Sequence, residues 1–532
     1  MATIALLMDD VKVRPKLHLG KFAAPTVGVL ILLAIWELLA RTVAAERHVI
    51  PTIPELISTM VSDGFYASAS GVTLWEAARG YFWGNLVALA VAAGCLLLPP
   101  VKDFLIRLAM ITYCTPTIAI APLLIVLLTQ DEAKVAMAAL SVFFPTLLGA
   151  LLGLEGGPKT ALEFSYVSGA SNWFSLTRIR LRAAVPEIAA ALALAAPAAI
   201  VGAMIGEYLG GDNGLGVMMV QAQQSANVAR VWAVAVVATG ISTIFYLAIN
   251  AWAKRMEYTA TSTEFAVRTS GQLSGDKMRV GRTLLRVVVS FVAIIVIWYA
   301  ALWISGMDDY IAKTPLDVLL YLTVGDEAAE HRALLFEGLK TTLGHALIGY
   351  TAGTVVAIVA AVAFLNSRLL EGMFMPVVMT LRAVPLVAMT PLLALVFGRG
   401  TATVAVLAGA VTFVPTLVLV LAALRSVPKP ALDLMHVVSA NWWQSLTWVR
   451  IMYAIPALAA SARIAIPGSI LGAVLVEMLV TGDGIGYTVA MSIGVSDYNA
   501  LWSALALLSL ATALIYVLLS WVETKLMSRI TS

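Results

Sequence analysis

Long apolar stretches recur along the whole chain, among them residues 24–40, 231–252, 287–304 and 500–522. A helix of about 20 apolar residues is long enough to cross the hydrocarbon core of a bilayer. Only 12% of the residues are charged, and soluble domains carry about 25%. We therefore expect an all-α integral membrane protein, since lipid is the solvent that this balance fits.

These stretches predict twelve membrane-spanning helices. The cytoplasmic connections of membrane proteins carry an excess of Lys and Arg, and the segment before the first predicted span is basic. Arg41 follows the first apolar run, so we expect no cleaved signal peptide. We predict a multi-pass protein of the bacterial plasma (inner) membrane with both termini in the cytoplasm. The predicted spans are 24–44, 73–98, 104–129, 133–154, 183–209, 230–253, 284–305, 341–365, 373–397, 401–424, 454–480 and 500–523.

The two halves of the sequence match one another in register. Gly80-Tyr81 recurs 269 residues later as Gly349-Tyr350, and Pro122 recurs as Pro391 at the same separation. Each half has an even number of spans, so we predict two parallel six-helix repeats related by a pseudo-twofold axis along the membrane normal. Beyond one extra residue the separation is 270, and it relates Pro145 to Pro415, Trp173 to Trp443, Arg180 to Arg450, Glu207 to Glu477, Gly214 to Gly484 and Gly216 to Gly486.

The repeat predicts four parts of the chain. Residues 1–23 form a cytoplasmic N-terminal segment, and residues 24–256 form the first six-helix unit. Residues 257–282 are polar and contain Gly and Ser, which is typical of a flexible connection, so we expect a cytoplasmic linker there. Residues 283–532 form the second six-helix unit.

A long connection joins the fourth and fifth spans of each half, with about 28 residues in each case. Long ordered loops are usually functional. We expect a short helix, a turn and a second helix there, with aromatic side chains such as Trp173 and Trp443 on the surface. Those aromatic residues could anchor the loop in the lipid headgroups, or they could dock into a groove on a partner protein.

These two loops resemble the EAA motif of binding-protein-dependent ABC importer permeases. In that motif Glu-Ala-Ala is followed by Gly at the seventh position and by an Ile-x-Leu-Pro ending. Both copies lack the Ala pair, and the final Pro is replaced by Arg182 in one and Met452 in the other. The spacing is kept by Glu163, Gly169, Ile179 and Leu181 in the first loop, and with substitutions by Asp433, Ser439, Val449 and Ile451 in the second.

Further segments are similar to the nitrate/sulfonate/taurine branch of that family. They are residues 49–54, residues 381–393, Glu207 with the glycine segment 214–216, and Glu477 with 484–487. Family members are typically single six-helix subunits that dimerise. The resemblance therefore implies a type I ABC importer permease-like fold, with two permease units fused in one chain.

The resemblance implies which proteins this chain works with. No Walker-type phosphate loop is present, because residues 156–160 lack its glycine spacing. We expect a transport subunit rather than an enzyme, with no cofactor of its own. ATP and Mg would be held by two cytoplasmic ABC ATPase subunits. An extracytoplasmic solute-binding protein would dock on the outer loops around 210–216 and 481–486, and no nucleic acid is expected. The residues implied in ATPase coupling are Glu163, Gly169, Ser171, Trp173, Asp433, Ser439, Asn441 and Trp443.

Irregular helices and buried charges are the candidates for the translocation pathway. Arg463 could attract an anion, or it could pair with another charge inside the protein. Glu207 and Glu477 could line an outer gate, or they could cap backbone amides of the glycine loops, which we favour. His345 and Asn85 are expected to be packing residues. The full set of pathway candidates is Thr115, Pro116, Thr117, Pro385, Thr390, Arg463, Glu207 and Glu477, and no metal site is expected.

Alternating access between the two halves is the mechanism that we expect. Branch resemblance and Arg463 favour a small anion of the sulfonate, taurine or nitrate kind. Aromatic carboxylates and pyrimidine-type cofactor precursors stay open as substrates. An ion-coupled secondary transporter is the alternative, although such carriers usually need buried acidic or His relays and the span interiors hold few. A membrane enzyme is disfavoured, because no nucleophile or metal-ligand constellation is present.

Overall fold

The protein is described here from a computed structural model. The structure describes residues 23–42, 49–62, 64–97, 117–257, 295–304, 306–381 and 384–531, and the single positions 105 and 292. All regular secondary structure in this part of the chain is helical, which confirms the all-α prediction.

The two halves contain closely similar series of elements. Short π-helical turns, labelled η, precede α9 and α20 at equivalent places, whereas η4 follows α20 where α9 of the first half continues as an α-helix. The first half contains α1 (Ala23–Arg41), α2 (Ile53–Ser62), α3 (Phe65–Leu97), α5 (Thr117–Leu127), α6 (Gln130–Glu155), α7 (Lys159–Val167), α8 (Asn172–Ser175), η1 (Leu176–Arg180), α9 (Leu181–Gly210), α10 (Leu215–Gln224) and α11 (Val228–Glu257). The second contains α13 (Pro315–Thr323), α14 (Ala328–Asn366), α15 (Arg368–Leu381), α16 (Leu386–Phe397), α17 (Thr401–Arg425), α18 (Lys429–Val437), α19 (Trp442–Ser445), η3 (Leu446–Arg450), α20 (Ile451–Val476), η4 (Glu477–Thr481), α21 (Gly484–Gly494) and α22 (Tyr498–Thr531).

Eight helical segments in the described ranges are long and apolar enough to cross a membrane. They are α3, α6, α8 to α9 and α11 in the first half, and α14, α17, α19 to η4 and α22 in the second. The predicted span 24–44 corresponds to α1, whereas residues 106–116 of the span 104–129 and residues 284–291 of the span 284–305 lie outside the described residues.

The prediction of a single helix at 373–397 is wrong. Helix α15 ends at Leu381, and α16 begins at Leu386. Pro385 occupies the N-cap of α16 with an extended backbone. Because proline disfavours the helical conformation in the residue that precedes it, the chain breaks here and restarts in a new helix.

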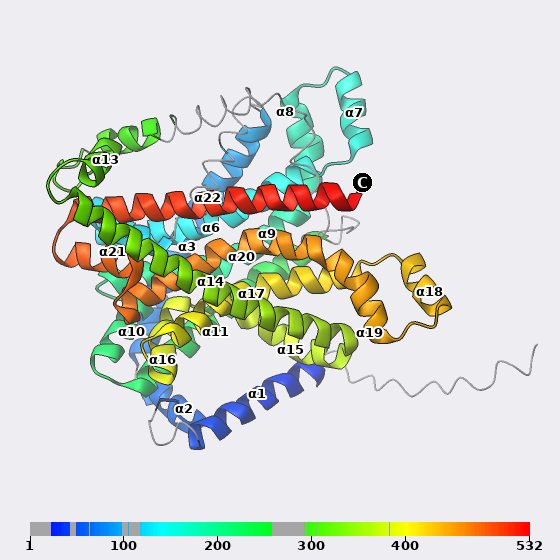
Figure 1. The fold of residues 1–532 in the computed structure, drawn as a ribbon, viewed down its shortest axis with the longest axis horizontal. Helices are drawn as coiled ribbons and strands as arrows, with labels where there is room; N and C mark the ends of the chain where they lie inside the picture. Colours follow the sequence, from blue (N-terminus) through cyan, green and yellow to red (C-terminus); the bar gives the residue numbers. More distant parts are fainter. Residues whose placement is uncertain are drawn as a thin grey trace, which may run out of the picture.

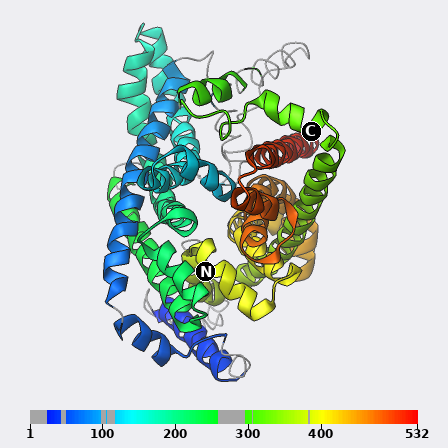
Figure 2. The same ribbon diagram turned by 90° about the vertical axis from the view of Figure 1, so that its left-hand side faces the viewer.

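The long helices run side by side, and the two kinds of connection lie at opposite ends of the bundle (Figure 1). The hairpins α7–α8 and α18–α19 project from one end, which we call the hairpin end, and the C-terminus of α22 lies there too. Helices α10 and α21 lie at the other end, which we call the glycine end. Viewed from the glycine end, the two halves stand next to each other (Figure 2).

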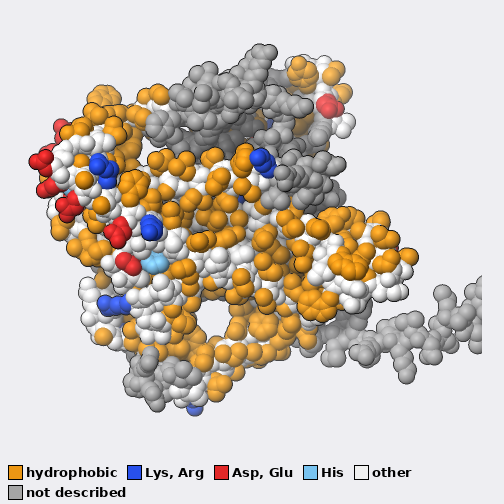
Figure 3. Space-filling view, viewed as in Figure 1, with side chains coloured by type: hydrophobic (Ala, Val, Ile, Leu, Met, Phe, Trp, Pro, Cys, Tyr) orange, Lys and Arg blue, Asp and Glu red, His pale blue; other side chains and the backbone are white. Residues whose placement is uncertain are grey.

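The surface of the bundle is apolar between the two ends. Hydrophobic side chains cover its middle, and acidic side chains gather at the glycine end (Figure 3). This distribution fits a protein surrounded by lipid at mid-height.

Small residues bring the spanning helices close together in both halves. A Cβ atom added at Gly80 of α3 would collide with Ala138 of α6, and one added at Gly349 of α14 would collide with Ala408 of α17. Gly84 and Gly353, one turn further, are equally tight against α6 and α17. This spacing of small residues is how membrane helices approach without a hydrophobic driving force. The equivalent contacts show that the sequence repeat is also a structural repeat.

Three helices cross from one half to the other. Helix α1 packs on α15, with Gly28 against the backbone of Met373. Helix α5 contacts α20 and α21, and α16 contacts α9, α10 and α11. The contact between the halves is apolar and closed, since Ile118 and Ala119 of α5 and Val387 of α16 are buried in one cluster.

Candidate functional site

Each hairpin contains a left-handed turn between two short helices. Gly169 has φ +71° in the first hairpin, and Ser439 has φ +53° at the equivalent place in the second. Glycine adopts this conformation without steric cost, whereas a residue with a Cβ is strained in it. The sequence correctly predicted the helix–turn–helix form of both loops.

Side chains at the N-caps fix the second helix of each hairpin. Ser171 Oγ accepts a hydrogen bond from the amide of Phe174 at 3.2 Å. In the second hairpin, Asn441 Oδ1 accepts from the amide of Gln444, and Gln444 Oε1 accepts from the amide of Asn441, both at 2.8 Å. Such reciprocal capping satisfies two helix-end amides that would otherwise have no partner.

Large apolar side chains are exposed on both hairpins. Trp173 is 63% exposed and its repeat mate Trp443 is 64% exposed. Val167 and Val437 are 84% and 79% exposed. The structure thus places the predicted coupling residues together on two surfaces at the same end of the bundle. The predicted residues that are exposed on these surfaces are Glu163, Gly169, Ser171, Trp173, Asp433, Ser439, Asn441 and Trp443.

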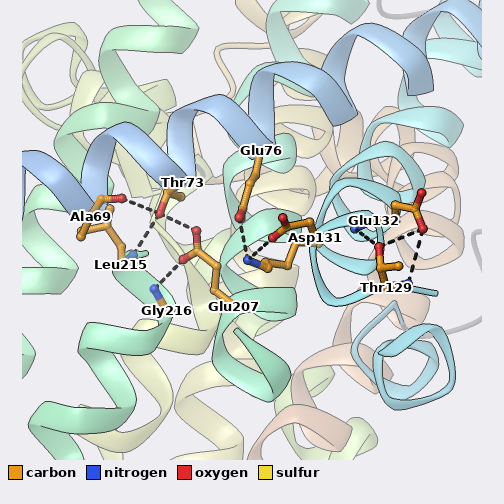
Figure 4. Close-up of polar contacts among 10 residues, drawn as sticks. Ala69, Thr73, Glu76, Thr129, Asp131, Glu132, Glu207, Leu215 and Gly216 are labelled. Carbon is orange, nitrogen blue, oxygen red and sulfur yellow. Dashed lines mark hydrogen bonds and ion pairs between the residues drawn. The ribbon is translucent and has the colours of Figure 1, made fainter. Parts of the chain in front are cut away.

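At the glycine end, Glu207 of α9 is buried and holds the start of α10. Thr73 Oγ1 donates to Glu207 Oε1 at 2.6 Å, and the amide of Gly216 donates to Glu207 Oε2 at 2.7 Å. The amide of Leu215 in turn donates to Thr73 Oγ1 at 2.9 Å. One carboxylate therefore joins three helices, α3, α9 and α10 (Figure 4).

A buried ion pair lies beside this carboxylate. Glu76 stands one turn after Thr73 on α3, next to Glu207 (Figure 4). Lys134 Nζ lies 2.8 Å from Glu76 Oε1 and 3.1 Å from Oδ1 of the exposed Asp131. Both Glu76 and Lys134 are buried, so their charges must be balanced inside the protein.

Glu477 occupies the equivalent position in the second half. Thr342 Oγ1 and the amide of Gly486 both donate to Glu477 Oε2, at 2.7 and 3.1 Å. The amide of Ile485 donates to Thr342 Oγ1 at 2.9 Å, as in the first half. The other oxygen, Oε1, lies 2.9 Å from Nδ1 of His345. This carboxylate joins α14, η4 and α21.

Glycine is required where each loop passes its glutamate. Gly214 has φ +118° and Gly484 has φ +76°. A Cβ atom at either position would collide with the carboxyl group of Glu207 or Glu477. The expectation that these glutamates cap amides of the glycine loops is therefore confirmed by the contacts, while a role as an outer gate stays a prediction.

Sequence reasoning missed five members of these clusters, and Glu76 is one of them. Thr73 and Thr342 were visible only as matching positions of the repeat, Lys134 was not singled out, and His345 was expected to be a packing residue. The repeat offered a signal, because a polar residue follows each of these Thr residues by one helical turn. Glu76 lies beside Glu207, and His345 contacts Glu477.

The predicted pathway residues lie in several places. Thr390 and Pro385 are buried on α16, and Thr117 begins α5, so three of them lie on the helices that cross between the halves. Thr115 and Pro116 lie outside the described residues. Among the residues that the structure describes, no group of three or more His, Cys, Asp or Glu could hold a metal ion.

Arg463 has an acidic partner within its own half. Its Nη1 atom lies 3.2 Å from Oε2 of Glu523 on α22, and both side chains are mostly buried. The guanidinium also lies over the ring of Tyr516, 6.0 Å from its centroid. Of the two alternatives for Arg463, this contact favours structural pairing.

Comparison with known proteins places the chain in a family. Residues 84–258 and 353–532 each match the family described as binding-protein-dependent transport system inner membrane component. The chain is 30% identical over 236 residues to the riboflavin transport system permease protein RibX of Chloroflexus aurantiacus, which covers 44% of this chain and 86% of the relative. No solved structure matches significantly.

Two further relatives are transport permeases as well. The formylaminopyrimidine transport permease protein ThiX of Halalkalibacterium halodurans is 27% identical over 201 residues, 36% of this chain and 78% of its own length. The putative aliphatic sulfonates transport permease protein SsuC of Bacillus subtilis is 23% identical over 207 residues, 38% of this chain and 75% of its own length. This multi-pass membrane protein therefore belongs to the binding-protein-dependent ABC importer permeases, as a transport subunit with two permease units in one chain.

Proposed function

We propose that the two hairpins are the sites on which two ABC ATPase subunits dock. The observation that carries this proposal is the exposure of the same apolar residues, in the same register, on both hairpins. Aromatic side chains that are exposed in a free subunit are typical anchors of protein interfaces. The hairpin end is then cytoplasmic, and so is the C-terminus of α22, which lies at that end.

The other end of the bundle would receive the solute. A solute-binding protein docks on the glycine end, and the solute passes between the halves along α5 and α16. The closed apolar contact of Ile118, Ala119 and Val387 is the barrier that opens when the halves move apart. ATP binding by the docked subunits supplies the energy, and the hairpins transmit it.

For the substrate we propose a small heteroaromatic solute. Two relatives, at 30% and 27% identity, are named for riboflavin and formylaminopyrimidine, and the sulfonate relative is 23% identical. The pairing of Arg463 with Glu523 supports this choice, because a neutralised guanidinium offers little attraction to an anion. A sulfonate remains the second candidate, and it requires that Arg463 leave Glu523 during transport.

The docking proposal is tested by Trp173→Ala and Trp443→Ala. An interface anchor contributes about 2 kcal/mol or more when truncated, which weakens binding about thirtyfold. We expect each variant to lose most of the ATPase that co-purifies with the co-expressed wild-type chain, and the double variant to lose all of it. Trp75→Ala on α3 is the matched control, because Trp75 is 66% exposed but lies on a spanning helix. Unchanged ATPase binding by the double variant would contradict the proposal.

The substrate proposal needs uptake measurements. Vesicles that contain the chain with its ATPase and binding protein are supplied with labelled riboflavin, a pyrimidine precursor or taurine. ATP-dependent uptake of a heteroaromatic compound supports the proposal. Uptake of taurine alone would overturn it.

A further inference from the structure

The two buried glutamates fix the position of the glycine loops, residues 210–216 and 481–486, relative to the spanning helices. Glu207 ties the start of α10 to α3 and α9, and Glu477 ties the start of α21 to α14 and η4. Each loop is thereby held by hydrogen bonds to a side chain of a spanning helix, in addition to apolar packing.

Stability alone does not explain these carboxylates. A charge buried in a membrane protein is costly, and a well-packed apolar group in its place is often more stable. Both halves nevertheless keep the glutamate, the threonine and the left-handed glycine together. This cost raises the question of what else the arrangement does.

The charges around the two glutamates are balanced in different ways. Where the first half has Glu76, the second has His345, which contacts Glu477 directly. Where the first half has Lys134, the second has the buried Val404. This register is structural, because Gly80 packs on Ala138 as Gly349 packs on Ala408. Glu207 thus has Glu76 and Lys134 as neighbours, and the equivalent Glu477 has His345 and Val404. We call these pairs the two neighbour sets.

We infer that Glu207 and Glu477 are positioning residues for solute delivery. Each glutamate holds its glycine loop in the conformation to which the solute-loaded binding protein binds, and each needs one of the two neighbour sets to do so. The inference rests on the proposed docking of that protein at the glycine end. The loops at 210–216 and 481–486 are the contact in this proposal, and Lys134 and His345 are the basic side chains that complete the two neighbour sets.

This inference is tested by giving the first half the neighbour set of the second half. Glu76→His alone leaves the buried Lys134 without its buried partner, and Lys134→Val alone leaves Glu76 without its cation. The double variant reproduces the set of the second half. We expect each single variant to raise the half-saturating concentration of loaded binding protein by about tenfold, and the double variant to recover to within about threefold of wild type.

The readout separates positioning from folding. It is the ATPase activity of the reconstituted full complex, measured against the concentration of loaded binding protein, with the amount of co-purified ATPase as the measure of intact hairpins. If the single variants fail to fold, the test is the folded double variant alone, whose half-saturating concentration of loaded binding protein should still lie within about threefold of wild type. A double variant that is no better than the worse single variant would overturn it.

The failure of the inference differs from the failure of the proposed function. If loaded binding protein does not stimulate the wild-type complex, the proposed docking is wrong. If it stimulates the wild type and both single variants equally, docking stands and the positioning role is wrong.

Discussion

Repeat mates are more alike on the hairpins than in the membrane interior. At the hairpins, repeat mates have nearly the same exposure, as Trp173 and Trp443 show at 63% and 64%. In the interior, mates differ in charge: Ala193 corresponds to Arg463, and the buried Ala253 corresponds to Glu523. The proposed docking of two like ATPase subunits would require this surface to stay alike in both copies. An interior site only has to neutralise its own charges, so it can diverge.

The largest effect is expected where the interior has diverged. Arg463→Ala leaves Glu523 buried without its partner, so the free energy of unfolding should fall by about 3–5 kcal/mol. Arg463→Ala with Glu523→Ala recreates the Ala193–Ala253 arrangement and should recover most of that loss. Thermal unfolding of the purified protein in detergent measures both.

Transport by the double variant sharpens the result. If Arg463 only pairs with Glu523, uptake should return along with stability. A stable double variant that transports nothing would instead show that Arg463 contacts the solute.

The glycine loops should show a smaller effect that is alike in both halves. Gly214→Ala and Gly484→Ala force a Cβ atom into the glutamate carboxyl and strain the backbone, which costs about 1–3 kcal/mol. Gly482→Ala is the control, because Gly482 has φ +77° but open space around its Cβ position. Its cost should be lower, since it carries the backbone strain alone. Equal thermal stability of the Gly482→Ala and Gly484→Ala variants would show that the glutamate contact does not matter.

The smallest effect is expected in the hairpin turns, and it has opposite signs in the two copies. Ser439→Gly removes the strain of a left-handed serine, and Gly169→Ser introduces it, each worth about 1 kcal/mol. Hydrogen exchange of the turn amides should slow about fivefold in the first variant and quicken about fivefold in the second. The amide of Ala440, which donates to Met435 O at 2.9 Å, probes the turn of Ser439, and the amide of Ala170, which donates to Ser165 O at 3.0 Å, probes the turn of Gly169. Equal rates in all three proteins would mean that the turns are not strained.

Much of this architecture could be predicted because a feature that occurs in both halves of the sequence is supported by two independent stretches of residues. Glycines that return in register predicted the loops that pass Glu207 and Glu477, while the turn at Gly169 was expected from the resemblance to the EAA motif, because its repeat mate is Ser439. The helix–turn–helix form of the hairpins followed from the same comparison. Each of these features depends on residues close together in the chain or related by one constant separation.

The pairings between helices could not be predicted in this way. Glu523 lies 60 residues from Arg463, and no local pattern shows which faces of α20 and α22 meet. His345 resembled a packing residue because its partner, Glu477, is 132 residues away. The sequence predicted a span at 373–397 that Pro385 and Pro391 distort, but not its complete division before Leu386, because the hydropathy of this stretch is continuous.

Helix α1 belongs to the first half by sequence but rests on α15 of the second, with Gly28 against the backbone of Met373. The two units are thus interlaced and not simply placed next to each other. Joining them in one polypeptide does not have to create their affinity. It guarantees their stoichiometry, because every first unit is made together with one second unit.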